Sequence, residues 1–171
     1  MPVLDIVLYP DPRLREVCAP VDTVTDEIRK LLSDMAETMY EAPGIGLAAP
    51  QVGVLKRVIV VDVTDAEDPD AARNLRKLVN PEIIEARGET VYEEGCLSIP
   101  SVRESVKRFS SLTLKALDEN GIEISFEADG LLAICLQHEI DHLNGILFID
   151  HLSYLKQQML KGKLKRLGQE K

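Results

Sequence analysis

The segment 136–145, LQHEIDHLNG, carries two histidines and a glutamate at a spacing that suits metal chemistry. On a helix, positions four apart share a face, so His138 and His142 can place two imidazole nitrogens on one metal ion. Glu139 lies beside them, where its carboxylate can accept a proton from a water on that ion. The pattern therefore predicts hydrolysis by a metal-activated water.

The surrounding sequence favours a functional site over a chance match. The simpler alternative is a helix that carries two histidines without a metal, but the chain has three histidines in all and two of them are here. The helix face that leads to His138 is apolar, through Leu131, Ile134 and Cys135. The pair should therefore point into a cleft or interior, where imidazoles without partners would be costly.

A catalytic site of this kind needs a third protein ligand beside its open position. The zincin protease pattern H-E-x-x-H-x-x-G-x-x-H is matched as far as Gly145, but its last position is Phe148. A glutamate on a following helix also fails, because the only later glutamate is Glu170, near the end of the chain. His151 lies beyond the expected end of the helix, and we expect it at the surface.

Two cysteines remain as candidates for the third ligand. Cys135 precedes His142 by seven residues, which is ~10 Å of helix rise and too far for one ion. Cys96 lies in the segment 93–100, EEGCLSIP, whose glycine and proline indicate an exposed bend between strands. We therefore predict Cys96 as the third ligand. One thiolate and two imidazoles suit Zn²⁺ or Fe²⁺ rather than Mg²⁺ or Ca²⁺.

The loop 44–51, GIGLAAPQ, contains a literal match to the dinucleotide-binding pattern G-x-G-x-x-A. That pattern must come after a strand and open a helix, whereas here a helix precedes it and Pro50 interrupts the residues after it. We therefore expect no dinucleotide. The glycines are better explained as positions where the backbone comes close to a ligand.

Hydrophobic periodicity predicts an α+β fold, in which a helix is followed by several antiparallel strands and then by further helices. We expect helices over 25–41, over 130–143 and from about 153, and strands at 57–63, 78–86, 89–92, 111–117 and 122–126. The local signals for caps and turns are Thr23 or Thr25, Arg87-Gly88, Asn120-Gly121, Asp129 and Asn144-Gly145. Acids and proline at 65–70 indicate a surface loop.

Length and composition predict a single catalytic domain over residues 1–171, since 45% of the chain is hydrophobic and 29% is charged. No basic leader and no apolar run of ~18 residues is present, so we expect a cytoplasmic protein without membrane contact. Although the net charge is −9, the segment 152–171 carries six basic residues and one acidic residue. This segment is predicted to form a basic C-terminal helix, which either is simply solvated or contacts the ribosome.

Three segments together, GIGLAAPQ at 44–51, EGCLS at 94–98 and QHEIDH at 137–142, resemble the signature set of peptide deformylases. The likeness extends over the whole chain in order and spacing, and corresponds to the short bacterial or organellar class with a C-terminal helix. It implies an α+β fold of antiparallel strands packed around a central metal-binding helix, with an N-terminal and a C-terminal helix. It also implies an enzyme that removes the N-formyl group from formyl-methionine on nascent polypeptides.

The resemblance assigns a role to each motif residue. Cys96, His138 and His142 would hold Fe²⁺, which Zn²⁺ or Ni²⁺ can replace. Glu139 would be the general base and then the general acid. Gln51 and the backbone N–H of Leu97 would bind the developing oxyanion, and the residues expected at the substrate pocket are Ile45, Gly46, Glu94, Arg103, Leu131, Ile134 and Cys135. For Ile134 and Cys135, core packing is an equally simple explanation.

Two other functions are open at this point. A zincin-like endopeptidase would use the same metal chemistry, but the chain lacks that family's downstream ligand. A non-catalytic, ribosome-associated metal-binding module would use the basic tail and give Glu139 no catalytic task.

Overall fold

The computed structural model describes residues 3–64 and 73–169, with side chains described up to residue 162. Its helices are α1 (Asp26–Glu41), α2 (Gly130–Leu143) and α3 (Tyr154–Gln169), with short 3-10 helices η1 (Pro12–Arg15), η2 (Ala49–Val52) and η3 (Phe148–His151). Its strands are β1 (Gly46–Ala48), β2 (Val58–Val61), β3 (Arg76–Arg87), β4 (Thr90–Cys96), β5 (Ile99–Arg108), β6 (Ser111–Leu117) and β7 (Glu123–Asp129). The α+β prediction is confirmed.

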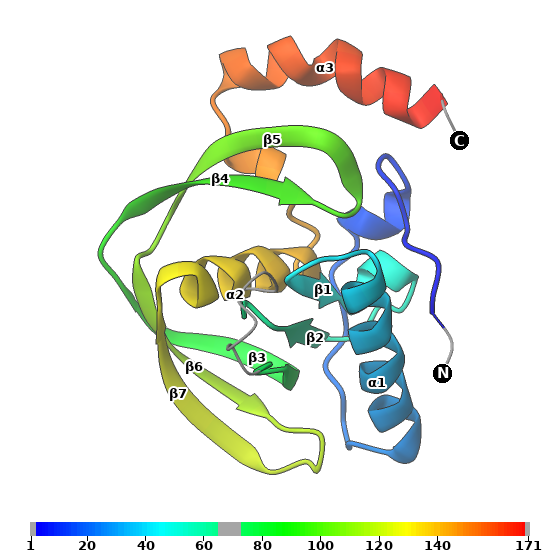
Figure 1. The fold of residues 1–171 in the computed structure, drawn as a ribbon, viewed down its shortest axis with the longest axis vertical. Helices are drawn as coiled ribbons and strands as arrows, with labels where there is room; N and C mark the ends of the chain where they lie inside the picture. Colours follow the sequence, from blue (N-terminus) through cyan, green and yellow to red (C-terminus); the bar gives the residue numbers. More distant parts are fainter. Residues whose placement is uncertain (1–2, 65–72, 170–171) are drawn as a thin grey trace.

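The strands form two antiparallel sheets, one of five strands in the order β1-β2-β3-β6-β7 and one made of the β4–β5 hairpin. The two sheets are joined by one long hairpin, in which β3 pairs with β6 in the large sheet and β4 pairs with β5, and the chain bends sharply between β3 and β4. Gly88 occupies this corner with a φ of 70°, and Ser110 N–H donates to the Arg87 carbonyl across it. The bend carries β4 over the opposite side of α2, which therefore lies between the large sheet and the β4–β5 hairpin (Figure 1).

Strand β2 shows why the large sheet accepts a helix on each face. Its four residues are all buried, and alternate side chains point to opposite faces of the sheet. Ile59 and Val61 join the core beneath α2, while Val58 and Val60 join the core beneath α1. A strand covered on both faces is expected to be apolar throughout, as this one is.

Helix α2 begins and ends close to its predicted bounds. Every residue from 133 to 140 is buried, which fits a helix enclosed on several sides. Asp129 occupies the N-cap position, but its side chain makes no capping hydrogen bond, contrary to the prediction. Asn144 is the C-cap, and Gly145 comes next with a φ of 73°, a left-handed conformation that ends a helix at little cost in glycine.

Several other local predictions are corrected or sharpened by the structure. Thr25, rather than Thr23, caps α1. Strand β5 was not predicted, and the 44–51 loop contains β1 and η2. The Asn120-Gly121 hairpin is present, but its connection runs from 118 to 122 because Asp118 accepts hydrogen bonds from three backbone N–H groups within it. The predicted 65–70 loop lies outside the described residues.

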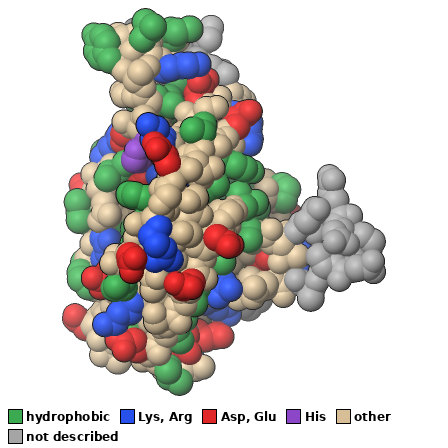
Figure 2. Space-filling model, turned by 90° about the vertical axis from the view of Figure 1, so that its left-hand side faces the viewer, with side chains coloured by type: hydrophobic (Ala, Val, Ile, Leu, Met, Phe, Trp, Pro, Cys, Tyr) green, Lys and Arg blue, Asp and Glu red, His purple; other side chains and the backbone are tan. Residues whose placement is uncertain are grey.

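Helix α3 projects from the body instead of packing along it (Figure 1). Leu160 packs against the core beneath the β4–β5 hairpin, and Lys156 forms an ion pair with Glu104 at 2.8 Å. Leu155 and Met159, expected on its apolar side, are each 70% exposed, and Leu164 lies beyond the described side chains. Figure 2 shows hydrophobic side chains gathered on this projecting segment.

Candidate metal centre and active-site cavity

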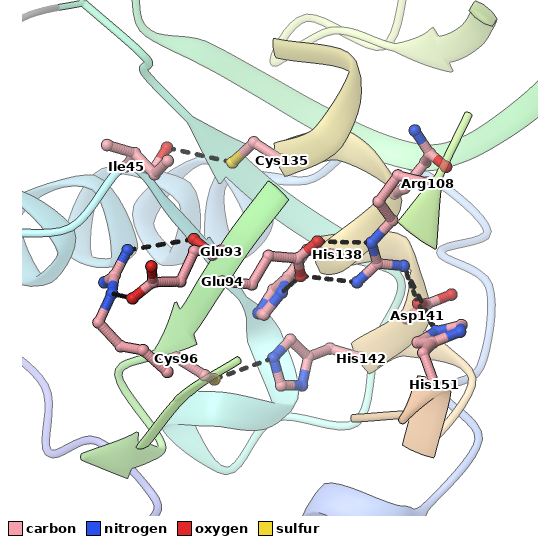
Figure 3. Close-up of polar contacts among 12 residues, drawn as sticks. Ile45, Glu93, Glu94, Cys96, Arg108, Cys135, His138, Asp141, His142 and His151 are labelled. Atoms are coloured by element: carbon pink, nitrogen blue, oxygen red, sulfur yellow. Dashed lines mark hydrogen bonds and ion pairs between the residues drawn. The ribbon is translucent and has the colours of Figure 1, made fainter. Parts of the chain in front are cut away.

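The three predicted metal ligands come together although they belong to different elements. Cys96 is the last residue of β4, and His138 and His142 lie one helical turn apart on α2. One ligand atom from each residue lies within 4.8 Å of the others, and Cys96 Sγ is 3.4 Å from His142 Nε2 (Figure 3). The cysteine is half-buried at a strand end, and not in the exposed bend that was predicted.

The imidazole of His138 is oriented by a buried carboxylate. Its Nδ1 lies 2.9 Å from Glu94 Oε1, and Glu94 in turn accepts hydrogen bonds of 2.7 and 2.8 Å from Arg108 (Figure 3). Burial disfavours the charge of Glu94, but the hydrogen bonds from Arg108 and His138 outweigh this effect and lower its pKa to about 2. An ionised Glu94 favours a proton on His138 Nδ1, and this arrangement would leave Nε2 for a metal.

The network continues to the surface through residues without a predicted role. Arg108, whose side chain is 3% exposed, also donates to Asp141 Oδ2 at 2.7 Å. The same oxygen lies 2.8 Å from Nε2 of His151, which is exposed as predicted yet fixed by this contact. The sequence does contain a signal for Arg108. Side chains alternate between the two faces of a strand, and Arg108 lies on the same inward face of β5 as Val102 and Val106.

Phe148, the residue that ended the protease pattern, has its own place at the centre. Its ring is buried in η3 and stacks on the His138 ring, with centroids 6.1 Å apart and an interplanar angle of 24°. The position that would carry a third histidine in a zincin therefore packs against the first histidine here.

Glu139 is buried on α2 directly after His138, beside the ligands. Burial, together with the nearby Glu94 charge, raises its pKa to about 7, while His138 opposes this shift. Within the described part of the chain, its Oε1 atom is buried without a hydrogen-bond partner. A carboxyl group of this kind is suited to exchanging protons near neutral pH.

Gln51 and Leu97 approach the ligands from two other loops. The Gln51 side chain is buried in η2, and its Nε2 lies 3.5 Å from Cys96 Sγ. Leu97 comes directly after Cys96 in the turn between β4 and β5. Both residues border the same cavity as Glu139.

The cavity has a volume of about 500 Å³. Every residue predicted at the substrate pocket lines it, namely Ile45, Gly46, Glu94, Arg103, Leu131, Ile134 and Cys135. The Glu94 carboxylate is already engaged by Arg108 and His138, so its contact with a ligand would be through its backbone or stem. Arg103 is exposed at the rim, where it pairs with Glu93 at 3.3 Å.

Gly46 allows β1 to lie directly against α2 at this cavity. A Cβ atom at this position would come within 2.6 Å of Glu139 Oε2 and 2.7 Å of Cys135 Sγ. We expect Gly46→Ala to displace Glu139 and to lower the kcat of the reaction at this centre at least ~10-fold, since small displacements of reacting groups have large effects on rate.

The matched control for this variant is Gly162→Ala in α3, where an added Cβ would meet nothing within 4 Å. The control should retain the parent kcat. Comparable kcat values for both variants would contradict the close approach at Gly46.

The donor set fits a divalent transition metal. Burial is the main cause that lowers the pKa of His142 well below its usual value, and the positive charge of Arg108 adds to it, which favours the neutral imidazole that a metal requires. His138 has the carboxylate partner that commonly orients a metal-binding histidine. A sulfur ligand such as Cys96 suits a soft or borderline metal better than Mg²⁺ or Ca²⁺.

The antiparallel strands bury helix α2, which carries two of the three ligand residues, beside a cavity large enough for a substrate. This combination is typical of a metal-dependent hydrolase. A family model described as polypeptide deformylase matches residues 3–158. The peptide deformylase of Hydrogenovibrio crunogenus is 55% identical over 166 residues, covering 97% of this chain and 95% of the relative.

Solved structures agree with this likeness. The peptide deformylase of Legionella pneumophila is 45% identical with a TM-score of 0.88, covering 98% of this chain and 96% of that one. A Met-Ala-Ser-bound deformylase of Acinetobacter baumannii is 38% identical with a TM-score of 0.82, covering 88% and 99%.

The chain belongs to the polypeptide deformylase family, whose members are metal-dependent enzymes. Its activity is the removal of the N-formyl group from nascent peptides. This activity differs from the two alternatives that the sequence left open, an endopeptidase and a non-catalytic metal-binding module. Among the described residues, no helix is both long and apolar enough to cross a membrane.

Proposed function

We propose that Cys96, His138 and His142 hold the metal ion for deformylation, and that Glu139, Gln51 and Leu97 act on the substrate beside it. The observation that carries this assignment is the convergence of the three ligand atoms within 4.8 Å, at a cavity bordered by the other three residues. When bound, the metal supplies a Lewis acid that activates a water near neutral pH and polarises the formyl oxygen. Fe²⁺ is the proposed native ion, and Zn²⁺ or Ni²⁺ can substitute.

Glu139 is the proposed general base and acid. It takes a proton from the attacking water as oxygen bonds to the formyl carbon, and it later gives this proton to the amine nitrogen as the C–N bond breaks. The products are formate and a peptide with a free amino terminus. The raised pKa of about 7 supports both halves of this role, because neither protonation state is strongly disfavoured near neutral pH.

Gln51 and Leu97 are the proposed donors to the oxyanion. The Gln51 amide and the Leu97 backbone N–H would each donate to the formyl oxygen as negative charge develops on it. A fixed donor of this kind typically contributes ~3–4 kcal/mol to the transition state. A formyl carbon carries only hydrogen, so a narrow site would exclude acetyl groups sterically.

The cavity is proposed to hold the methionine side chain and the first residues of a nascent chain. Ile134 and Cys135 offer buried apolar wall, Leu131 is half-buried beside them, and Arg103 lies at the rim. The Gly46 backbone, on edge strand β1, would pair with an extended peptide. The related Acinetobacter baumannii deformylase was crystallised with Met-Ala-Ser, which supports a peptide of this kind as the ligand.

The experiment that tests this proposal is formate release from formyl-Met-Ala-Ser, with acetyl-Met-Ala-Ser as the matched control. We expect formate from the first peptide and no cleavage of the second. Treatment with a metal chelator should abolish activity, and Fe²⁺ added without oxygen should restore it, because a thiolate-ligated Fe²⁺ is prone to oxidation. Undiminished activity after complete metal removal would contradict the proposal.

Helix α3 is proposed to bring the enzyme to the ribosome, within a single catalytic domain that acts in the cytoplasm. Support comes from the charge of 152–171 and from the position of α3 at the outside of the molecule (Figure 1). We expect removal of residues 161–171 to leave kcat/KM on a short formyl peptide within ~2-fold, since the Lys156 and Leu160 contacts remain.

The same truncation should abolish co-sedimentation with ribosomes at low salt, because basic side chains dominate such binding. The full chain is the control and should be released by raised salt. Unchanged co-sedimentation of the truncated enzyme would exclude α3 as the contact.

A further inference from the structure

The Gln51 side chain is held at both ends of its amide. Its Oε1 accepts a hydrogen bond from the Ala48 N–H at 3.0 Å. Its Nε2 donates to Ser98 Oγ at 3.1 Å and to Cys96 Sγ at 3.5 Å. Gln51 is 1% exposed and Ser98 is 0% exposed, so these contacts are shielded from water.

An amide nitrogen carries two hydrogens in fixed directions. Ser98 takes one of them at 3.1 Å, and the other makes only a long contact of 3.5 Å with Cys96 Sγ, which a substrate oxygen in the cavity would replace. Because Ser98 takes one hydrogen, the other is directed at Cys96, toward the ligand cluster and the cavity. The Ala48 N–H holds only the Oε1 side of the amide, and the last side-chain torsion is a broad one, so loss of the Ser98 contact would leave the Nε2 hydrogens less tightly aimed. The aim of the second N–H at the cavity thus depends on Ser98.

The backbones that carry these residues are joined by the N-terminal segment. Val7 N–H donates to the Gln51 carbonyl at 2.7 Å, and Tyr9 N–H donates to the Ser98 carbonyl at 2.8 Å. Residues 7–9 therefore bridge η2 and the β4–β5 turn, and they fix the spacing across which Gln51 reaches Ser98.

We propose that Ser98 is a positioning residue for deformylation, which directs the Gln51 amide toward the substrate oxygen. This inference rests on the proposed role of Gln51 as an oxyanion donor. Ser98 does not need to touch the substrate; it takes one N–H of Gln51 so that the other is presented in a fixed direction. Pre-set donors of this kind act without reorganisation at the moment of reaction.

A double-mutant cycle on the metal-loaded enzyme tests the proposal, with formyl-Met-Ala-Ser as substrate. We expect Ser98→Ala to lower kcat by ~10- to 100-fold, less than the ~10²–10³-fold loss for Gln51→Ala, with KM changed less than ~2-fold. In the Gln51→Ala background, Ser98→Ala should lower kcat by no more than a further ~2-fold, because residues that act as a unit are not additive.

Metal content and thermal unfolding measured on each variant separate positioning from loss of structure. Ser110→Ala is the matched control, since Ser110 Oγ donates to the Arg87 carbonyl at 3.2 Å at the sheet corner, and this variant should keep the parent kcat. Equal losses from Ser98→Ala in both backgrounds, or a loss that tracks metal content, would overturn the role of Ser98. A fully active Gln51→Ala variant would instead overturn the proposed function.

Discussion

Replacing Glu139 with glutamine is expected to lower kcat for formate release by ~10²–10⁴-fold, the usual effect of removing a general acid–base group. Glutamine keeps the size of the side chain but can neither take a proton from the attacking water nor deliver one to the amine. Glu139 is buried beside His138 and His142, and no other buried carboxylate among the described residues both lines the cavity and lacks a partner for one of its oxygens. We therefore expect no other carboxylate to replace Glu139 as the base in this variant.

Metal content must be measured in the same preparation, and it should match the parent enzyme. The control variant is Glu127→Gln on β7, whose carboxylate is exposed and pairs only loosely with Arg87 at 3.4 Å. That variant should show the parent kcat. If Glu139→Gln retained kcat within ~3-fold while fully loaded with metal, the assignment of the general base would be wrong.

Replacing Arg108 with methionine is expected to destabilise the protein by ~3–5 kcal/mol, as is typical when one partner of a buried ion pair is removed. The Arg108 guanidinium serves two carboxylates at once, those of Glu94 and Asp141, at distances of 2.7 to 2.8 Å. Methionine fills most of the volume but leaves both charges without their shared partner. Urea unfolding at a fixed excess of metal measures this loss.

The same Arg108 variant should bind metal ~10- to 100-fold more weakly, the usual effect of disturbing a residue that supports a ligand. Glu94 depends on Arg108 for its low pKa, and His138 depends on Glu94 for its orientation. Competition against a chromogenic chelator measures the affinity.

The matched control for Arg108 is Arg87→Met, because Arg87 also contacts two carboxylates but its side chain is 38% exposed. This control should change stability by no more than ~0.5 kcal/mol and leave metal affinity unaltered. Equal behaviour of the two variants would show that the buried network does not support the centre.

Local features of the chain are predictable from sequence because local forces produce them. Helix α2 matches its predicted bounds within a residue or two because its apolar residues recur at helical spacing and Gly145 can adopt the left-handed conformation that ends it. The i, i+4 spacing of His138 and His142 is a property of any α-helix. Elimination of the other candidates led to Cys96, and its thiol does lie beside these imidazoles.

Other local signals were present but misleading or incomplete. The sequence predicts only a loop over 44–51 because a three-residue strand is too short for periodicity to reveal, and β1 forms only because β2 offers it a partner. Strand β5 was missed because charged residues break its pattern, although Val102, Val106 and Arg108 share one face.

The positions of the helices and of most turns, and the two histidines at helical spacing, can be predicted from the amino-acid sequence, since they depend on side-chain chemistry and near-neighbour sterics. Three contacts could not be predicted without the folded structure: Glu94 faces inward to hold His138, Arg108 joins Glu94 to Asp141, and Ser98 meets Gln51. These contacts join residues far apart in the chain. They depend on the sharp bend at Gly88 that folds β4 and β5 over α2. Because of this bend, the charges of Glu94 and Arg108 are buried and paired with each other instead of exposed to solvent.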